Sequence, residues 1–126
     1  MSDCCFILFQ SPGISLDQAA ELFAPPHWRV NRVDGMLVLQ LGDSPVFRIA
    51  RSSEPHVVIE SAEIGDGSPH SDAVSKCDSR FEVLTDDLDS ALDEINTLID
   101  VQATLQDATE GFMFTCWNGV LSPPHP

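Results

Sequence analysis

The chain contains four cysteines and four histidines, which are enough sulfur and nitrogen ligands for a zinc site. Structural zinc sites usually take their ligands in closely spaced pairs, such as two cysteines separated by two residues. This sequence has no such pair, and the adjacent Cys4 and Cys5 would point to opposite faces of a strand. Because free cysteines are common in protein cores, we predict free thiols and no metal or other cofactor. The residues concerned are Cys4, Cys5, Cys77, Cys116, His27, His56, His70 and His125.

A second chemical possibility lies in the segment GDGSPHSD, residues 65–72, which places serine, histidine and aspartate close together. Nucleophilic catalysis needs a serine or cysteine beside a histidine that an acid orients. Turn-forming loops have the same composition, and the glycines lack the lysine of a phosphate-binding loop. The segment therefore leaves one alternative open, a small enzyme or ligand-binding domain with a pocket near residues 65–79.

Eight acidic residues and no lysine or arginine lie between Asp86 and Glu110. Surface helices usually mix the two signs, because opposite charges four residues apart add a few tenths of a kcal/mol per pair. The run is either a solvated face that keeps the protein soluble or a docking surface for a basic protein. At about 100° per residue, its outward carboxylates gather on one side, so the candidate binding residues are Asp89, Asp93, Asp100 and Asp107. A magnesium site at this run would also require a cleft.

The acids fall on a stretch that predicts one long helix, from about Asp86 to Thr109. Thr85 or Asp86 can cap its first turn, and Gly111 can end it in a left-handed conformation. An apolar stripe recurs at spacings of four, three and four residues, which predicts burial of that side. We expect Leu88, Leu92, Ile95 and Ile99 to pack on Phe6, Leu8, Phe112 and Phe114.

The rest of the chain reads mainly as strands. Residues 4–9 form an apolar run typical of a strand near the middle of a sheet. Ser15 and Gln18 have capping-box spacing, which predicts a short helix that Pro25-Pro26 ends. Four strand-like segments joined by turn signals such as Asp34-Gly35 follow, which predicts a meander. These segments are Trp28–Val33, Met36–Leu41, Val46–Arg51 and His56–Ile64.

After an irregular stretch at residues 65–79, Arg80–Leu84 predicts a short edge strand and Phe112–Trp117 a buried one. Asn118-Gly119 is a turn signal that would fold Val120 and Leu121 back as a last strand. We therefore predict one α+β domain over residues 1–121, with the order β-α-β-β-β-β-(β)-α-β. It would have a mainly antiparallel sheet, a central four-strand meander and two helices packed on one face. Residues 122–126 form a proline-rich tail.

Charge and length narrow the classes of partner and of function that the protein could have. The 126 residues suffice for one domain. Twenty acids against six bases give a net charge of −14, which repels nucleic acid and anionic membranes and attracts cationic proteins. Four of the bases could bind an anion or pair with the protein's own carboxylates: Arg29, Arg32, Arg48 and Arg51. Without a secretory signal or a span of about 18 apolar residues, we expect a soluble cytoplasmic protein.

Small size, strong acidity, cytoplasmic character and an α+β body together resemble bacterial immunity proteins and type III secretion chaperones. The resemblance is one of general character over the whole chain and involves no diagnostic motif, so it transfers no functional residue. It implies a non-catalytic protein that binds another protein stoichiometrically. The sequence therefore predicts a protein-binding module whose acidic helix face docks a basic partner.

Overall fold

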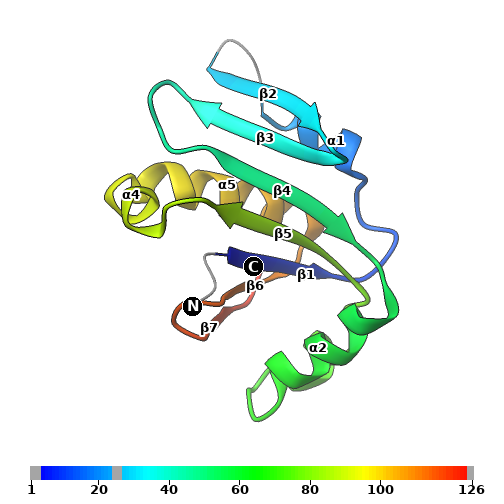
Figure 1. Ribbon diagram of the computed structural model, residues 1–126. Coiled ribbons are helices and arrows are strands. Elements are labelled where there is room, and N and C mark those ends of the chain that lie inside the picture. Colours follow the sequence, from blue (N-terminus) through cyan, green and yellow to red (C-terminus); the bar gives the residue numbers. More distant parts are fainter. Residues whose placement is uncertain (1–3, 24–26, 125–126) are drawn as a thin grey trace.

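A computed structural model describes residues 4–23 and 27–124, and it confirms an α+β fold built on an antiparallel sheet (Figure 1). The seven strands lie in the order β2-β3-β4-β5-β1-β6-β7. They are β1 (Cys4–Phe9), β2 (Trp28–Val33), β3 (Met36–Leu41), β4 (Phe47–Ser52), β5 (Ser79–Thr85), β6 (Phe112–Thr115) and β7 (Val120–Ser122). The helices of the described part are α1 (Leu16–Glu21), α2 (Pro55–Gly65), α3 (Ser71–Ser75), α4 (Leu88–Asp93) and α5 (Ile95–Thr109). Among the described residues, no helix combines the length and apolar composition needed to cross a membrane.

The first strand occupies the interior of the sheet, as its apolar sequence predicts. β1 pairs with β5 on one side and with β6 on the other, both antiparallel. Its residues alternate between two faces, and five of the six are buried. Cys5, Ile7 and Phe9 point to one face, and Cys4, Phe6 and Leu8 point to the other.

Local turn and cap signals are also confirmed. Asp34 and Gly35 both have positive φ, 52° and 76°, as a two-residue hairpin between β2 and β3 requires. Ser15 accepts from the backbone of Gln18, whose side chain bonds back to Ser15, which completes the capping box of α1. The end of that helix at Pro25-Pro26 lies outside the described residues, as does His125.

The predicted fourth strand of the meander, His56–Ile64, is wrong, because this segment forms α2. Its β-branched residues suggested a strand, but Pro55 takes the first helical turn, where proline needs no N–H partner. Val57, Ser61 and Gly65 recur every four residues and form its buried side. The region 65–79 is likewise not one irregular stretch, since it contains α3. The meander is completed instead by β5, which pairs with β4.

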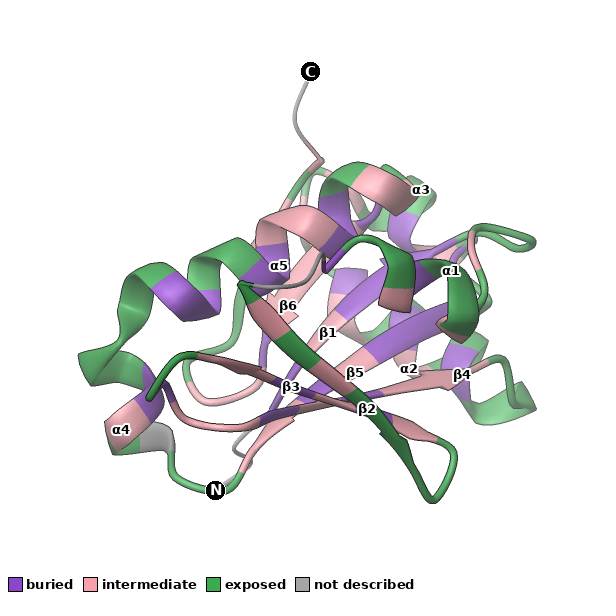
Figure 2. Ribbon diagram, turned by 90° about the horizontal axis from the view of Figure 1, so that it is seen from above, coloured by how far each residue is buried: buried purple, intermediate pink, exposed green. Residues whose placement is uncertain are grey.

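The helices cover both faces of the sheet, so the prediction of two helices on one face is wrong (Figure 2). α1, α4 and α5 cover what we call the α5 face, over a core that contains Ile7, Phe9, Phe47 and Phe81. α2 and α3 cover part of the opposite side, the α2 face, where Val74 and Cys77 pack around Leu8. The predicted contacts of the long helix with Phe6, Leu8, Phe112 and Phe114 are therefore also wrong. Phe6, Leu8 and Phe112 lie on the α2 face, and Phe114 pairs with Phe6 there.

The predicted single helix from Asp86 to Thr109 is two helices. Asp87, rather than Thr85 or Asp86, caps α4 by accepting from the Ser90 N–H. The chain breaks at Glu94, whose φ of −105° and ψ of 48° are not helical, and α5 begins at Ile95. α5 ends with Glu110 in the left-handed conformation, not Gly111. Gly111 instead allows its backbone to lie close to β1, because a Cβ there would be 2.6 Å from the carbonyl oxygen of Leu8.

Candidate docking surface on α4 and α5

One side of α5 is held firmly against the sheet. Leu98, Val101 and Leu105 are nearly or fully buried in the core of the α5 face. Two buried glutamines beside them satisfy their amides with neighbouring groups. Gln102 donates to the sulfur of Cys5 at 3.5 Å, and Gln106 donates to the carbonyl oxygens of Gly111, Ser122 and Pro123 at 2.9–3.2 Å. These contacts fix the rotation of α5 about its axis.

Three residues of the predicted apolar stripe lie in solvent instead, which corrects the predicted core. Leu92, Ile95 and Ile99 are 40, 42 and 49% exposed. The side chain of Leu88, the fourth member of the predicted stripe, lies outside the described part of the structure. The error has a physical cause, since α5 is apolar around more than half of its circumference. Helical spacing alone allowed either side to face the sheet, and Leu98, Val101 and Leu105 occupy it.

The four predicted binding residues are all exposed, but the break at Glu94 divides them between two helices. Asp89 and Asp93 belong to α4, and Asp100 and Asp107 belong to α5. Neither helix contains a lysine or arginine. The two helices therefore expose both apolar side chains and carboxylates. We call these exposed positions the α4–α5 surface, defined by Leu92, Ile95, Ile99, Asp89, Asp93 and Asp100.

Two hollows flank α5, and two consecutive residues of the helix, Ile99 and Asp100, line one hollow each. Ile99 lines a hollow of about 230 Å³ between α5 and the β6–β7 hairpin, together with Ala103, Met113 and Pro123. Asp100 lines a hollow of about 430 Å³ on the other side of the helix. The remaining described residues around that second hollow are Leu22, His27, Trp28 and Leu41. The two sides of α5 therefore differ in charge.

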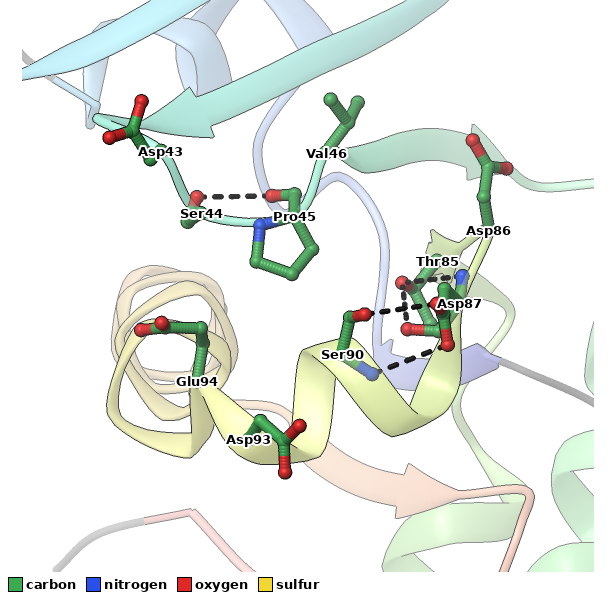
Figure 3. A pocket seen from close by; sticks show the side chains of 10 residues that line it. All are labelled: Asp43, Ser44, Pro45, Val46, Thr85, Asp86, Asp87, Ser90, Asp93 and Glu94. Atoms are coloured by element: carbon green, nitrogen blue, oxygen red, sulfur yellow. Dashed lines mark hydrogen bonds between the residues drawn. The ribbon is translucent and has the colours of Figure 1, made fainter.

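A larger hollow of about 480 Å³ lies between α4 and the turn from β3 to β4 (Figure 3). Its carboxylates do not converge on one point, because those of Asp43, Asp86 and Asp93 point in different directions (Figure 3). Asp86 pairs with Arg48, and Asp87 accepts from Ser90, and these hydrogen bonds lower the pKa of both carboxyl groups. Within the described residues, no three His, Cys, Asp or Glu side chains are grouped so that they could hold a metal ion.

The arginines that could have bound an anion are engaged within the protein. Arg32 pairs with Asp17 and Arg48 with Asp86. Arg29 donates to Gln40 and to the Gly42 carbonyl, and Arg51 donates to the carbonyls of Pro12 and Ile14. These contacts support the interpretation that they serve the fold.

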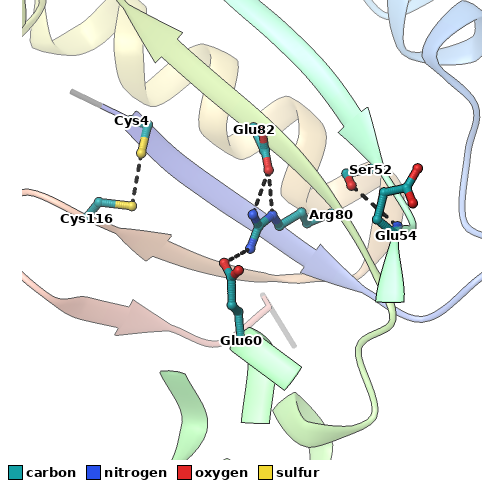
Figure 4. Close-up of polar contacts among 7 residues, drawn as sticks. All are labelled: Cys4, Ser52, Glu54, Glu60, Arg80, Glu82 and Cys116. Carbon is teal, nitrogen blue, oxygen red and sulfur yellow. Dashed lines mark hydrogen bonds and ion pairs between the residues drawn. The ribbon is translucent and has the colours of Figure 1, made fainter. Parts of the chain in front are cut away.

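Arg80, which sequence reasoning assigned no role, is the most buried basic residue of the described chain, at 4% exposed (Figure 4). It contacts Glu60 of α2 at 2.9 Å and Glu82 of β5 at 2.7 Å, and it lies 4.0 Å from the ring centre of Phe6. Burial opposes its charge, but the two carboxylates outweigh this effect and raise its pKa. The cluster links α2 to the sheet. Only the spacing of Arg80 and Glu82, two residues apart on β5, could have signalled part of it.

All four cysteines are free thiols. Cys4 and Cys116 lie on neighbouring chain segments with their sulfur atoms 3.1 Å apart (Figure 4). Burial raises the pKa of Cys5 and of Cys116 to about 12, and that of Cys77 to about 11. Such thiols are poor nucleophiles near neutral pH. The hollow that Cys77 lines contains no histidine among its described residues, and the His70 ring packs 5.5 Å from that of Phe112.

Fold and surface together describe an α+β protein with an unpartnered helix surface on one face of a seven-stranded antiparallel sheet. No protein-family model matches the sequence, and comparisons with curated proteins and with solved structures find no significant match.

Proposed function

We propose that this protein is a non-catalytic binding module that docks a basic protein on the α4–α5 surface. The observation that carries the proposal is the exposure of Leu92, Ile95 and Ile99 on two helices that also expose carboxylates and contain no lysine or arginine. Large apolar side chains supply affinity when a partner covers them. Carboxylates around them select a cationic partner and speed its association.

The apolar residues distinguish this surface from a face that serves solubility alone. Exposed apolar side chains that occur singly are ordinary, but a group of them beside charged residues marks an interaction surface. α2 also exposes apolar side chains, Val58 and Ile59, at 38 and 60%. These two are adjacent in sequence and diverge by about 100° around the helix, so they form no comparable patch. Ile95 and Ile99 are four residues apart and lie side by side.

The test begins with affinity capture from a lysate of the source cells at low salt. The captured protein is then purified, and its association rate is measured against three forms of this chain. They are the parent, the variant Asp89→Asn/Asp93→Asn/Asp100→Asn, and the control Glu63→Gln/Asp66→Asn/Asp72→Asn. The control removes the same number of charges from the region of α2 and α3.

We expect the α4–α5 variant to associate roughly tenfold more slowly than the parent at low ionic strength, with the difference shrinking as salt rises. The association rate of the control should fall far less, because its three substitutions lie in the region of α2 and α3, away from the α4–α5 surface. Equal rates for the two variants would show that net charge alone is responsible, which would overturn the proposal.

A further inference from the structure

The shape of the exposed side of α5 restricts what its partner can be. Ile95, Ile99 and the half-buried Ala103 follow one another at intervals of four and form a ridge along the helix. Because helix backbone groups are already hydrogen-bonded to one another, a partner cannot add to α5 as a strand. Contact must be made through side chains, and a second helix presents them at the matching spacing.

The charges beside the ridge are one-sided. The Ile99 hollow is lined by glutamines, Ser122 and apolar residues, and none of its described residues is charged. The other hollow is lined by Asp100, His27 and the apolar residues Leu22, Trp28 and Leu41. Trp28 is half-buried, and its ring is held by an edge contact with Phe23 at 5.2 Å between ring centres.

We propose that the partner segment is an amphipathic helix that lies along the α5 ridge and places lysine or arginine in the Asp100 hollow. This inference rests on the proposed function and adds the chemistry of the partner to it. Long basic side chains lay their aliphatic stems on apolar walls and keep the cation at the edge. In this hollow the cation meets the Asp100 carboxylate and lies within reach of an indole ring. The other flank of the partner helix is uncharged, because it faces the Ile99 hollow.

A second copy of this chain fits the ridge poorly. The chain has a net charge of −14, and two copies packed through α5 would bring Asp100 and its neighbours toward the same carboxylates. Like charges placed across an interface oppose association. The charge complement of this surface is a basic segment of another protein.

Two synthetic peptides of identical composition test the inference against the full chain. Both are 18-residue helices with a leucine stripe and four lysines. In the first peptide the lysines follow one flank of the stripe, and in the second they lie on the opposite side of the helix. Long-range attraction to the protein is therefore equal for the two. We expect the first peptide to bind at least tenfold more tightly at low salt, measured by fluorescence anisotropy.

Three variants of this chain test which of its residues contact the peptides. Asp100→Asn should bring the two affinities within about threefold of each other, whereas Asp72→Asn, on α3 and outside the α4–α5 surface, should leave their ratio unchanged. Ile95→Ser/Ile99→Ser should weaken both peptides at least tenfold, with an unchanged circular dichroism spectrum as the check on folding.

Equal binding of the two peptides to the parent, or a ratio that survives Asp100→Asn, would overturn the inference. So would binding that persists in the isoleucine variant, or sedimentation showing that the free chain dimerises through the ridge. If neither peptide binds, the helical partner is excluded. The captured protein's dependence on the α4–α5 acids would still decide the proposed function separately.

Discussion

On the α2 face, Glu60 and Glu82 share the buried guanidinium of Arg80, whereas on the α5 face Asp89, Asp93 and Asp100 lie on helices without any basic residue. Both regions carry carboxylates on elements that pack against the same sheet. In the first, one arginine pairs with both carboxylates and links α2 to β5. In the second, the acids remain in solvent beside exposed apolar side chains. The contrast separates acids that hold the fold together from acids that are available to a partner.

The sharpest test of this contrast uses two consecutive residues of α5. Leu98→Ala should destabilise the protein by roughly 2–5 kcal/mol, because it empties a packed site in the core. Ile99→Ala removes a side chain that is 49% exposed and should change stability by no more than about 0.5 kcal/mol. Urea denaturation of both variants measures the difference. Equal losses would mean that α5 is rotated from the position described, and the docking surface would be lost.

Arg80→Met tests the paired region. The change leaves Glu60 and Glu82 facing each other without a cation, and removal of one member of a buried ion pair is strongly destabilising. We expect a loss of about 3 kcal/mol, the lower end of the usual range, because the Glu60 side chain is 42% exposed. The double variant Arg80→Met/Glu82→Leu should recover part of it, since it removes one of the unpaired charges. Arg29→Ala, an exposed arginine on β2, is the matched control and should change little. A negligible effect of Arg80→Met would show that the cluster does not hold α2 in place.

A pH series compares the thiols beneath the two helix layers. Burial raises the pKa of Cys5, under α5, to about 12 and that of Cys77, beside α3, to about 11, from 9.0 in the unfolded chain. A raised pKa means that the folded state keeps its proton while the unfolded state loses it. The resulting stability is complete below pH 9 and declines as pH rises toward 11–12.

We therefore expect the free energy of unfolding, measured by urea denaturation, to fall between pH 9 and 10 by up to about 1 kcal/mol for each buried thiol. Cys5→Ser should flatten this dependence, and Cys77→Ser should flatten it almost as much, because both folded-state pKa values lie above this pH range. The comparison uses the pH slopes, because each substitution also changes stability at neutral pH. An unchanged slope in Cys5→Ser would contradict the burial of that thiol.

The smallest expected effect is the change in protein stability when the acids of α4 and α5 are neutralised. Asp89 and Asp93 lie four residues apart on α4, where like charges repel by roughly 0.2–0.5 kcal/mol. Replacing Asp89, Asp93 and Asp100 by asparagine should therefore raise the thermal midpoint slightly at low salt, with no gain at high salt. A loss of stability would assign these acids to the fold, in contradiction of the proposed docking role.

The parts of the fold that short-range chemistry determines could be predicted from the sequence. Asp34-Gly35 specifies a tight hairpin because both residues tolerate positive φ. Ser15 and Gln18 form a capping box whatever the surrounding fold, because the box needs only residues three positions apart. The apolar run at Cys4–Phe9 indicates an interior strand. The structure confirms each of these features.

The predictions from the sequence were wrong where two local conformations or helix orientations were possible and tertiary packing decided between them. Val57, Val58 and Ile59 favour a strand by composition, but a helix buries Val57 and Ser61 on one side and keeps Pro55 at its start. On α5, two apolar sides competed for the sheet. The side containing Leu98, Val101 and Leu105 packs there, so the predicted core became the exposed patch. The candidate acids could be recognised from the sequence, whereas the apolar residues beside them could be assigned only after the rotation of α5 was known.

The central position of β1 also has a kinetic consequence. The first strand of the chain pairs with residues 79–85 and with residues 112–115, so its hydrogen-bonded partners come from distant parts of the sequence. Pairings of high sequence separation must overcome the entropy of closing long loops before they contribute stability, and they slow folding. During synthesis, β1 must remain without its β6 partner until residues 112–115 have emerged. The β2–β3 hairpin, whose contacts are local, can form much earlier.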